Sequence, residues 1–162
     1  MIRRIAIIAS AAAIAVTSLT ACGAGNSPQT SKSKGSVQGT SQDKGSIAIR
    51  NAAIVTDGTD AYVQMTLINS GSQADELTSI VTSAAPKAVV SDSASKQLLT
   101  VALPSNVSVA FTNKGTTIDL QDPAKGTVSP QVGSLVSLSL SFKLAGDVTL
   151  QVPVLDYKSL TQ

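Results

Sequence analysis

The chain has one cysteine, Cys22, and no histidine, and these two facts limit the chemistry open to it. A lone thiol has no partner for a disulfide within the chain. Histidine is the usual general base near neutral pH, so its absence argues against the common hydrolytic mechanisms. Cys22 directly follows Leu19-Thr20-Ala21 and precedes Gly and Ala, which is an unusual setting for a buried, inert core thiol. The chemistry to explain is that of one thiol near the N-terminus.

Residues 1–21 have the layout of a secretory signal peptide. Arg3 and Arg4 form a positive n-region, an apolar run extends from Ile5 to Val16, and small residues lead to Ala21. An uncleaved transmembrane anchor is the alternative, but the run is short and rich in alanine, whereas a spanning helix needs about 20 mainly apolar residues. We therefore expect export and cleavage before Cys22.

Leu19-Thr20-Ala21-Cys22 resembles the lipobox of bacterial lipoproteins. The resemblance implies that Cys22 becomes the mature N-terminus and carries a diacylglyceryl group on its sulfur. Each buried methylene contributes about 0.8 kcal/mol, so two or three acyl chains hold a protein firmly on a membrane. The expected location is the extracytoplasmic face of the cell membrane, with the membrane as a partner through the lipid on Cys22.

The segment after the cysteine, residues 22–45, has the composition of a flexible tether. Gly23 to Lys44 are mainly Ser, Gly, Gln, Thr, Lys and Asn, and Val37 is the only aliphatic residue larger than alanine. Such a segment buries too little apolar surface to offset the entropy lost on ordering. We expect the folded domain to occupy residues 46–162.

The charge of the mature chain excludes a basic nucleic-acid footprint. Loss of Arg3 and Arg4 with the signal leaves ten Lys and Arg against ten Asp and Glu. The chain has two Phe, two Tyr and no Trp, whereas single-strand binders use stacking aromatics. Nucleic acid is therefore not an expected partner.

Short alternating segments from Ser46 onward predict an all-β domain. In Val136–Phe142 and Val148–Val154 every second residue is apolar, and a glycine-containing turn connects the two segments. Turn clusters rich in Gly, Asn, Asp and Pro separate the other candidates. These are Ile47–Ala53, Ala61–Leu67, Leu77–Ser83, Ala88–Val90, Leu98–Val101, Val107–Phe111 and Thr116–Leu120. About nine short strands without a convincing helix predict an antiparallel β-sandwich, with Gln121 to Ser134 as its longest loop.

The order of motifs resembles the extracytoplasmic copper chaperone family PCu(A)C over roughly Ser46 to Val154. The matching motifs are Asn51-Ala52, Ala61 to Gly71, Asp75-Glu76-Leu77, Gly115 to Leu120, Gly133 with Val136 to Phe142, and Ala145-Gly146 before Val148 to Val154. The resemblance implies a cupredoxin-like, Ig-like β-sandwich. Some members of that family are lipoproteins.

The copper ligands of that family, two histidines and two methionines, do not carry over to this chain. The resemblance places them near Ser91-Asp92-Ser93, in the stretch Lys96-Gln97-Leu98-Leu99, and near Thr117-Ile118-Asp119, where the chain has no His, Met or Cys. Met65 is the only methionine beyond the signal, and it lies on an apolar strand face, which is typical of a core residue. One thioether does not make a tight Cu(I) site alone.

Oxygen ligands are the remaining metal possibility. Asp92, Asp119 and Asp122 would converge if the family fold holds, and Asp57 and Asp60 flank Gly58 in a turn. Carboxylates suit Ca²⁺, Mg²⁺ or Mn²⁺ rather than Cu(I). Ordinary surface and turn roles explain both sets better than a metal site does, and we expect no metal and no cofactor.

Three functions fit these observations, and a minor enzymatic role is the least favoured of them. The favoured one is a binding or accessory lipoprotein that contacts another envelope protein or a ligand. The alternative is a copper chaperone or copper-homeostasis protein that completes its site with a partner, and copper is a cofactor only in that case. The sequence contains no nucleophile elbow and no Ser-x-x-Lys motif among its many serines, so we expect no enzyme and no catalytic residue.

Overall fold

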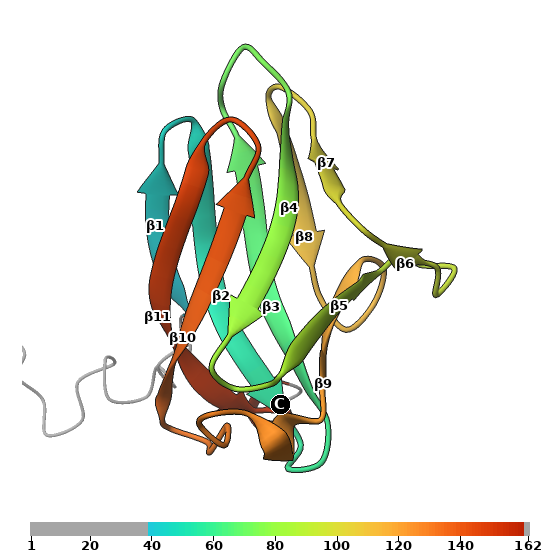
Figure 1. Cartoon of the computed structure of the whole chain (residues 1–162), viewed down its shortest axis with the longest axis vertical. Helices are drawn as coiled ribbons and strands as arrows, with labels where there is room; N and C mark the ends of the chain where they lie inside the picture. Colours follow the sequence, from blue (N-terminus) through green and yellow to red (C-terminus); the bar gives the residue numbers. More distant parts are fainter. Residues whose placement is uncertain (1–38, 161–162) are drawn as a thin grey trace, which may run out of the picture. The chain divides into compact units, whose positions relative to one another are not determined.

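The computed structural model describes residues 39–160, and strands make up most of this part of the chain (Figure 1). Eleven strands lie in it: β1 (Thr40–Lys44), β2 (Ile47–Thr56), β3 (Ala61–Asn69), β4 (Asp75–Thr82), β5 (Lys87–Ser91), β6 (Gln97–Leu98), β7 (Val101–Leu103), β8 (Val107–Phe111), β9 (Thr117–Gln121), β10 (Leu135–Phe142) and β11 (Gly146–Asp156). A 3-10 turn, η3 (Pro123–Lys125), and a one-turn helix, α3 (Tyr157–Leu160), accompany them.

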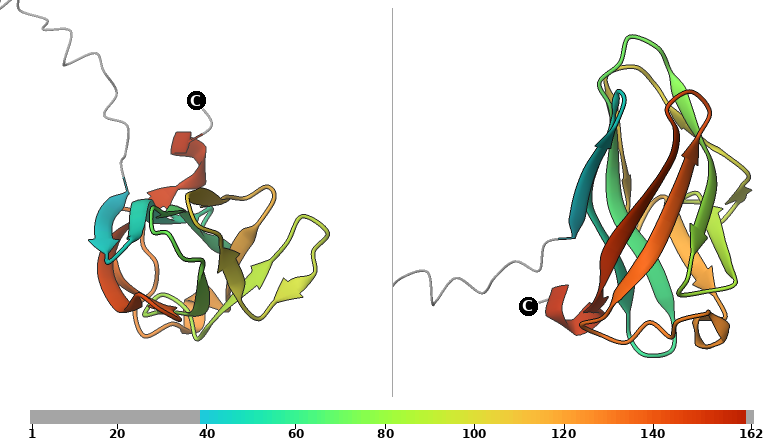
Figure 2. Two further views of the ribbon diagram at one scale, coloured as in Figure 1. Left: turned by 90° about the horizontal axis from the view of Figure 1, so that it is seen from above. Right: turned by 60° about the vertical axis from the view of Figure 1, so that its left-hand side comes forward.

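The strands form two layers around a common interior, as the view from above in Figure 2 shows. One layer is built on the antiparallel pair β2–β3, with β1 beside β2 and with β8 and β9 beside β3. β5 extends this layer from β9, and β6 extends it from β5. The second layer has the order β11-β10-β4-β7. The expected β-sandwich is therefore confirmed.

Alternation along the strands creates the core between the layers. In β3, every second residue from Ala61 to Asn69 is buried, and the same rhythm continues from Val136 to Phe142 in β10. Because successive side chains of a strand point to opposite faces, this pattern puts one face of each strand inside. Val, Leu, Ile and Ala supply most of the interior, and Phe111 and Phe142 are its aromatic residues.

A β-bulge divides β2 and lets it pair with two different strands along one edge. The register with β3 shifts between Arg50 and Ala53, and Asn51 there has a left-handed φ of 54°. Asparagine tolerates this conformation better than most residues. Before the bulge, β2 pairs with β1; after it, Ile54 lies opposite Val154 of β11 in parallel pairing. This pairing joins the two layers.

Three local expectations were wrong. Thr40–Lys44, assigned to the tether, form β1, because their backbone pairs with β2 although their side chains are mostly exposed. The single strand expected over Leu98–Val101 is two strands, separated by Leu99 and Thr100, and the Leu99 side chain is 88% exposed. The long loop after β9 contains η3, and a helical turn that we did not expect follows β11.

The expected signal peptide, Cys22 and the first part of the tether lie outside the described residues. Within residues 39–160, no helix has the length and apolar character needed to cross a membrane.

Candidate functional site

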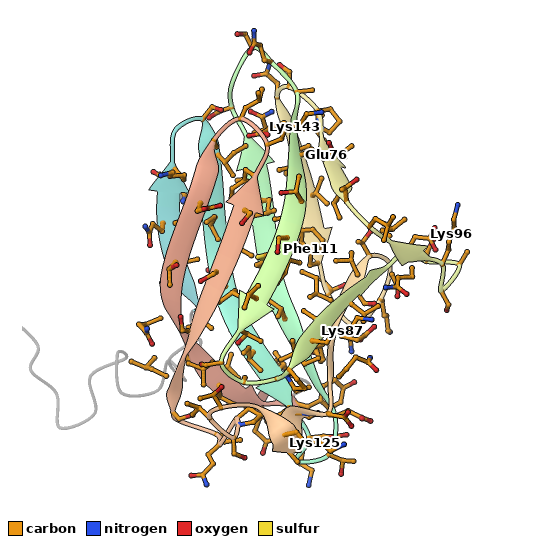
Figure 3. All side chains as sticks on the ribbon, viewed as in Figure 1. Glu76, Lys87, Lys96, Phe111, Lys125 and Lys143 are labelled. Carbon is orange, nitrogen blue, oxygen red and sulfur yellow. The ribbon has the colours of Figure 1, made fainter. Side chains whose placement is uncertain are left out.

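The three stretches that the family resemblance assigns to copper ligands lie side by side in the structure. β5 pairs with β6 on one edge and with β9 on the other. Ser91, at the end of β5, therefore lies opposite both Gln97 and Thr117. The side chains of these stretches are hydroxyl, amide and aliphatic groups, the carboxylates of Asp92 and Asp119, and the Lys96 ammonium. Figure 3 shows Lys96 near the tip of the protruding β5–β6 loop.

The carboxylates near this place make local hydrogen bonds or an exposed ion pair. Asp92 Oδ1 accepts the backbone N–H groups of Ala94 and Lys96, both at 2.9 Å, and so closes the β5–β6 loop. Asp119 Oδ2 accepts the Thr117 hydroxyl at 2.9 Å. Asp122 lies 3.5 Å from the Lys125 ammonium on an exposed surface.

No group of three or more His, Cys, Asp or Glu residues in the described range is close enough to hold a metal ion. Asp92, Asp119 and Asp122 therefore do not form the oxygen-ligand group considered above. Met65 is only 1% exposed and belongs to the main core cluster, so its thioether is closed to an incoming ion in this structure.

A groove of about 210 Å³ opens next to the same strands, between β4 and the β5–β6 pair. Its lining combines aliphatic side chains such as Ile80, Val90 and Leu98 with hydroxyl and amide groups such as Thr78 and Gln97. The place expected to hold soft metal ligands is thus bordered by aliphatic and neutral polar surface.

Both tyrosines of the chain line a second hollow of about 200 Å³. Tyr62 points outward from β3, and Tyr157 begins α3 directly after β11. Val55 is fully buried beneath them in a small cluster with Ala53 and Leu155, against which Tyr62 packs. Burial raises the pKa of Tyr62, and the nearby Tyr157 phenol adds to the effect. The two tyrosines are therefore the aromatic residues that line this hollow.

The rim of the tyrosine hollow carries Asp57, Asp60 and Asn113. Asp57 Oδ1 accepts the backbone N–H groups of Thr59 at 2.9 Å and Asp60 at 2.8 Å. These bonds lower the pKa of Asp57 below its usual value, so its carboxylate is ionised at neutral pH. The side-chain N–H of Asn113 lies 3.4 Å from the Tyr157 hydroxyl oxygen.

Sequence reasoning considered Asp57 and Asp60 only as a weak cation loop and missed the tyrosines beside them. The available signal was Tyr62, an aromatic residue on the polar face of an otherwise alternating strand. Tyr157 and Asn113 gave no comparable signal, because their approach depends on pairing between distant strands.

Solved structures of PCuAC domains share this fold. The copper-bound PCuAC domain from PmoF2 matches with a TM-score of 0.63 and 22% identity, over 72% of this chain and 98% of that chain. The apo PmoF2 PCuAC domain matches with a TM-score of 0.63 and 20% identity, over 72% of this chain and 95% of that chain. The apo PCuAC domain from PmoF1 matches with a TM-score of 0.62 and 21% identity, over 71% of this chain and 98% of that chain. The described domain is therefore a PCuAC-type β-sandwich.

A family model described as "Putative lipoprotein LpqE-like" matches residues 47–154, from the start of β2 to the last part of β11. The match covers more than half of the chain, so the chain belongs to the LpqE-like lipoprotein family. No curated protein matches the chain.

Proposed function

We propose that this chain is a lipid-anchored extracytoplasmic lipoprotein that uses a PCuAC-type domain for binding, without a copper site of the His and Met kind. In this proposal residues 1–21 are removed, and Cys22 carries the lipid. The lipobox-like sequence at Leu19–Cys22 and membership of a lipoprotein family support the anchor. The domain then acts near the membrane on another envelope protein or a ligand.

One observation carries the binding role: the copper-ligand stretches are adjacent in space, yet they contain no soft ligand. Ser91 lies between Gln97 and Thr117, and the chain has no histidine anywhere. Cu(I) prefers thiolate, thioether and imidazole ligands over hydroxyls and amides. A fold whose usual metal ligands are replaced keeps its shape but needs another function.

Titration of residues 39–162 with Cu(I) against a competing chelator tests this proposal. The segment starts before β1, so every described strand is kept. We expect the chelator to retain the copper under conditions in which a copper-binding PCuAC domain removes it. A one-to-one complex of submicromolar or tighter affinity would overturn the proposal and favour the copper-chaperone alternative.

A further inference from the structure

The tyrosine hollow combines two features that together select a class of ligand. Tyr62 and Tyr157 line it, and so do the carboxylate residues Asp57 and Asp60. The face of an aromatic ring attracts a cation and offers apolar surface to a short hydrocarbon stem. Carboxylates pair with the same positive charge. Each feature alone is ordinary, but both surround one space.

The size of the hollow limits the ligand to a small group. Pockets for drug-sized ligands usually enclose about 300–1,000 Å³. The tyrosine hollow encloses about 200 Å³, which suits one charged head on a short stem. A planar head matches the two rings better than a compact, strongly hydrated one, because a planar cation stacks on aromatic faces and loses less hydration.

The charged rim is preorganised on one side. Asp57 is held by two backbone N–H groups of its own turn. The backbone donors lower the pKa of Asp57 most, and Lys158 adds a smaller effect by charge attraction. Asp60 holds the turn through its backbone: its carbonyl oxygen accepts the Thr56 hydroxyl at 2.8 Å and the Asp57 N–H at 3.2 Å. The Asp60 side chain can therefore be changed without removing these bonds.

We propose that the tyrosine hollow binds a guanidinium group on a short aliphatic stem. The guanidinium stacks against Tyr62 and Tyr157 and donates hydrogen bonds to the carboxylates of Asp57 and Asp60, while the stem lies along the apolar surface of the rings. This chemistry belongs both to free alkylguanidines and to the arginine side chain of a partner protein. The inference rests on the proposed binding role and gives it a site.

The tyrosines themselves provide the measurement. The chain has two tyrosines and no tryptophan, so every tyrosine ring signal in an NMR spectrum comes from a wall of this hollow. We would titrate residues 23–162, which keep the whole described domain, with n-butylguanidinium. The matched control is n-butylurea, which has a similar shape and no charge.

We expect saturable shifts of both tyrosine ring signals with n-butylguanidinium and at least tenfold weaker binding of n-butylurea. Asp60→Asn should weaken binding about tenfold, whereas Asp147→Asn, at the opposite end of β11, should not. Binding should also weaken as salt is raised from 20 to 200 mM, because the rim is exposed. Equal binding of the neutral analogue, or no shift of either ring, would overturn the proposal.

Capped arginine tests whether the guanidinium comes from a protein side chain, and capped citrulline is its uncharged control. Binding of capped arginine as tight as that of n-butylguanidinium assigns the site to a protein side chain; binding of n-butylguanidinium alone assigns it to a small molecule. Tyr62→Leu should reduce binding while thermal unfolding shows a folded domain, and unchanged binding in that folded variant would also contradict the proposal. A chain that binds both n-butylguanidinium and Cu(I) would overturn the proposed function but retain this site.

Discussion

Asp75 and Leu144 are far apart in the sequence, yet the Asp75 carboxylate accepts the backbone N–H of Leu144 at 2.8 Å. It also accepts the N–H of Ala145 at 2.9 Å and that of Glu76 at 2.7 Å. Asp75 is only 6% exposed and begins β4, so one buried carboxylate ties this strand to the β10–β11 turn. Burial alone would raise the pKa of Asp75, but the backbone donors outweigh it and lower the pKa.

Asp75→Asn should destabilise the domain at neutral pH and make it less sensitive to acid. A group with a lowered folded-state pKa adds stability above its unfolded pKa of about 3.9 and loses it as the pH falls through the folded value. The amide nitrogen of Asn cannot accept a hydrogen bond, so we expect a loss of about 1–3 kcal/mol at pH 7. Urea unfolding at pH 7 and below pH 4 measures the difference in the free energy of unfolding between the unchanged domain and Asp75→Asn. This difference should be smaller in acid.

Glu76→Gln is the matched control for Asp75→Asn. Glu76 lies 3.6 Å from Lys143 in a partly exposed ion pair, which typically contributes about 0–1 kcal/mol. Figure 3 shows these two side chains at the same end of the sandwich. If Asp75→Asn and Glu76→Gln lowered the free energy of unfolding equally and with the same pH dependence, the proposed contribution of the buried Asp75 carboxylate would be contradicted.

Asn69→Ala should lower the free energy of unfolding by about 1–3 kcal/mol, because it leaves buried backbone groups without partners. Asn69 is fully buried; its side-chain N–H groups donate to the carbonyl oxygens of Gln73 and Leu103 at 2.8 and 2.9 Å. Ser70→Ala removes an exposed hydrogen bond to Ser46, which water can replace, so its effect should be much smaller. Chemical denaturation of the two variants tests the contrast, and equal effects would contradict it.

Removal of β1 should weaken the domain, although its side chains bury little surface. Residues 46–162 lack the ladder from Thr40–Lys44 to β2 and the 2.6 Å hydrogen bond from the Thr40 hydroxyl to the Gln151 carbonyl. The exposed edge of β2 can then pair with another molecule. We expect a lower unfolding midpoint than for residues 39–162, and concentration-dependent association in size-exclusion chromatography. If residues 46–162 and residues 39–162 had the same unfolding midpoint and were both monomeric, β1 would be dispensable.

Cys22→Ala should prevent stable membrane attachment or processing of the full chain. Without the thiol there is no atom to receive the lipid, and firm attachment needs at least two acyl chains or a second membrane signal. Fractionation and the mobility of the expressed protein measure both effects. Ser27→Ala, five residues further on, is the control and should leave the protein in the membrane fraction. Normal retention and size of the Cys22→Ala protein would contradict the anchor.

Much of the fold could be predicted because side-chain alternation is a local property. Val107–Phe111 was placed within its observed bounds, and the strand starting at Ile47 was found although it extends further, to Thr56. β1 was missed because its side chains are polar and exposed, and only backbone pairing with β2 orders it. No sequence pattern indicated that Tyr157 would approach Tyr62, because their approach depends on the three-dimensional fold.

The parallel pairing between β2 and β11 has a consequence for how the chain folds. Ile54 lies opposite Val154, so this hydrogen-bonded junction between the layers cannot form until almost the whole domain has been synthesised. Closing so long a loop costs entropy before the contact forms, and β-proteins dominated by such distant pairs fold in about milliseconds to seconds. In the export that we propose for this chain, the delay means that the last strand becomes available for pairing only after most of the domain has crossed.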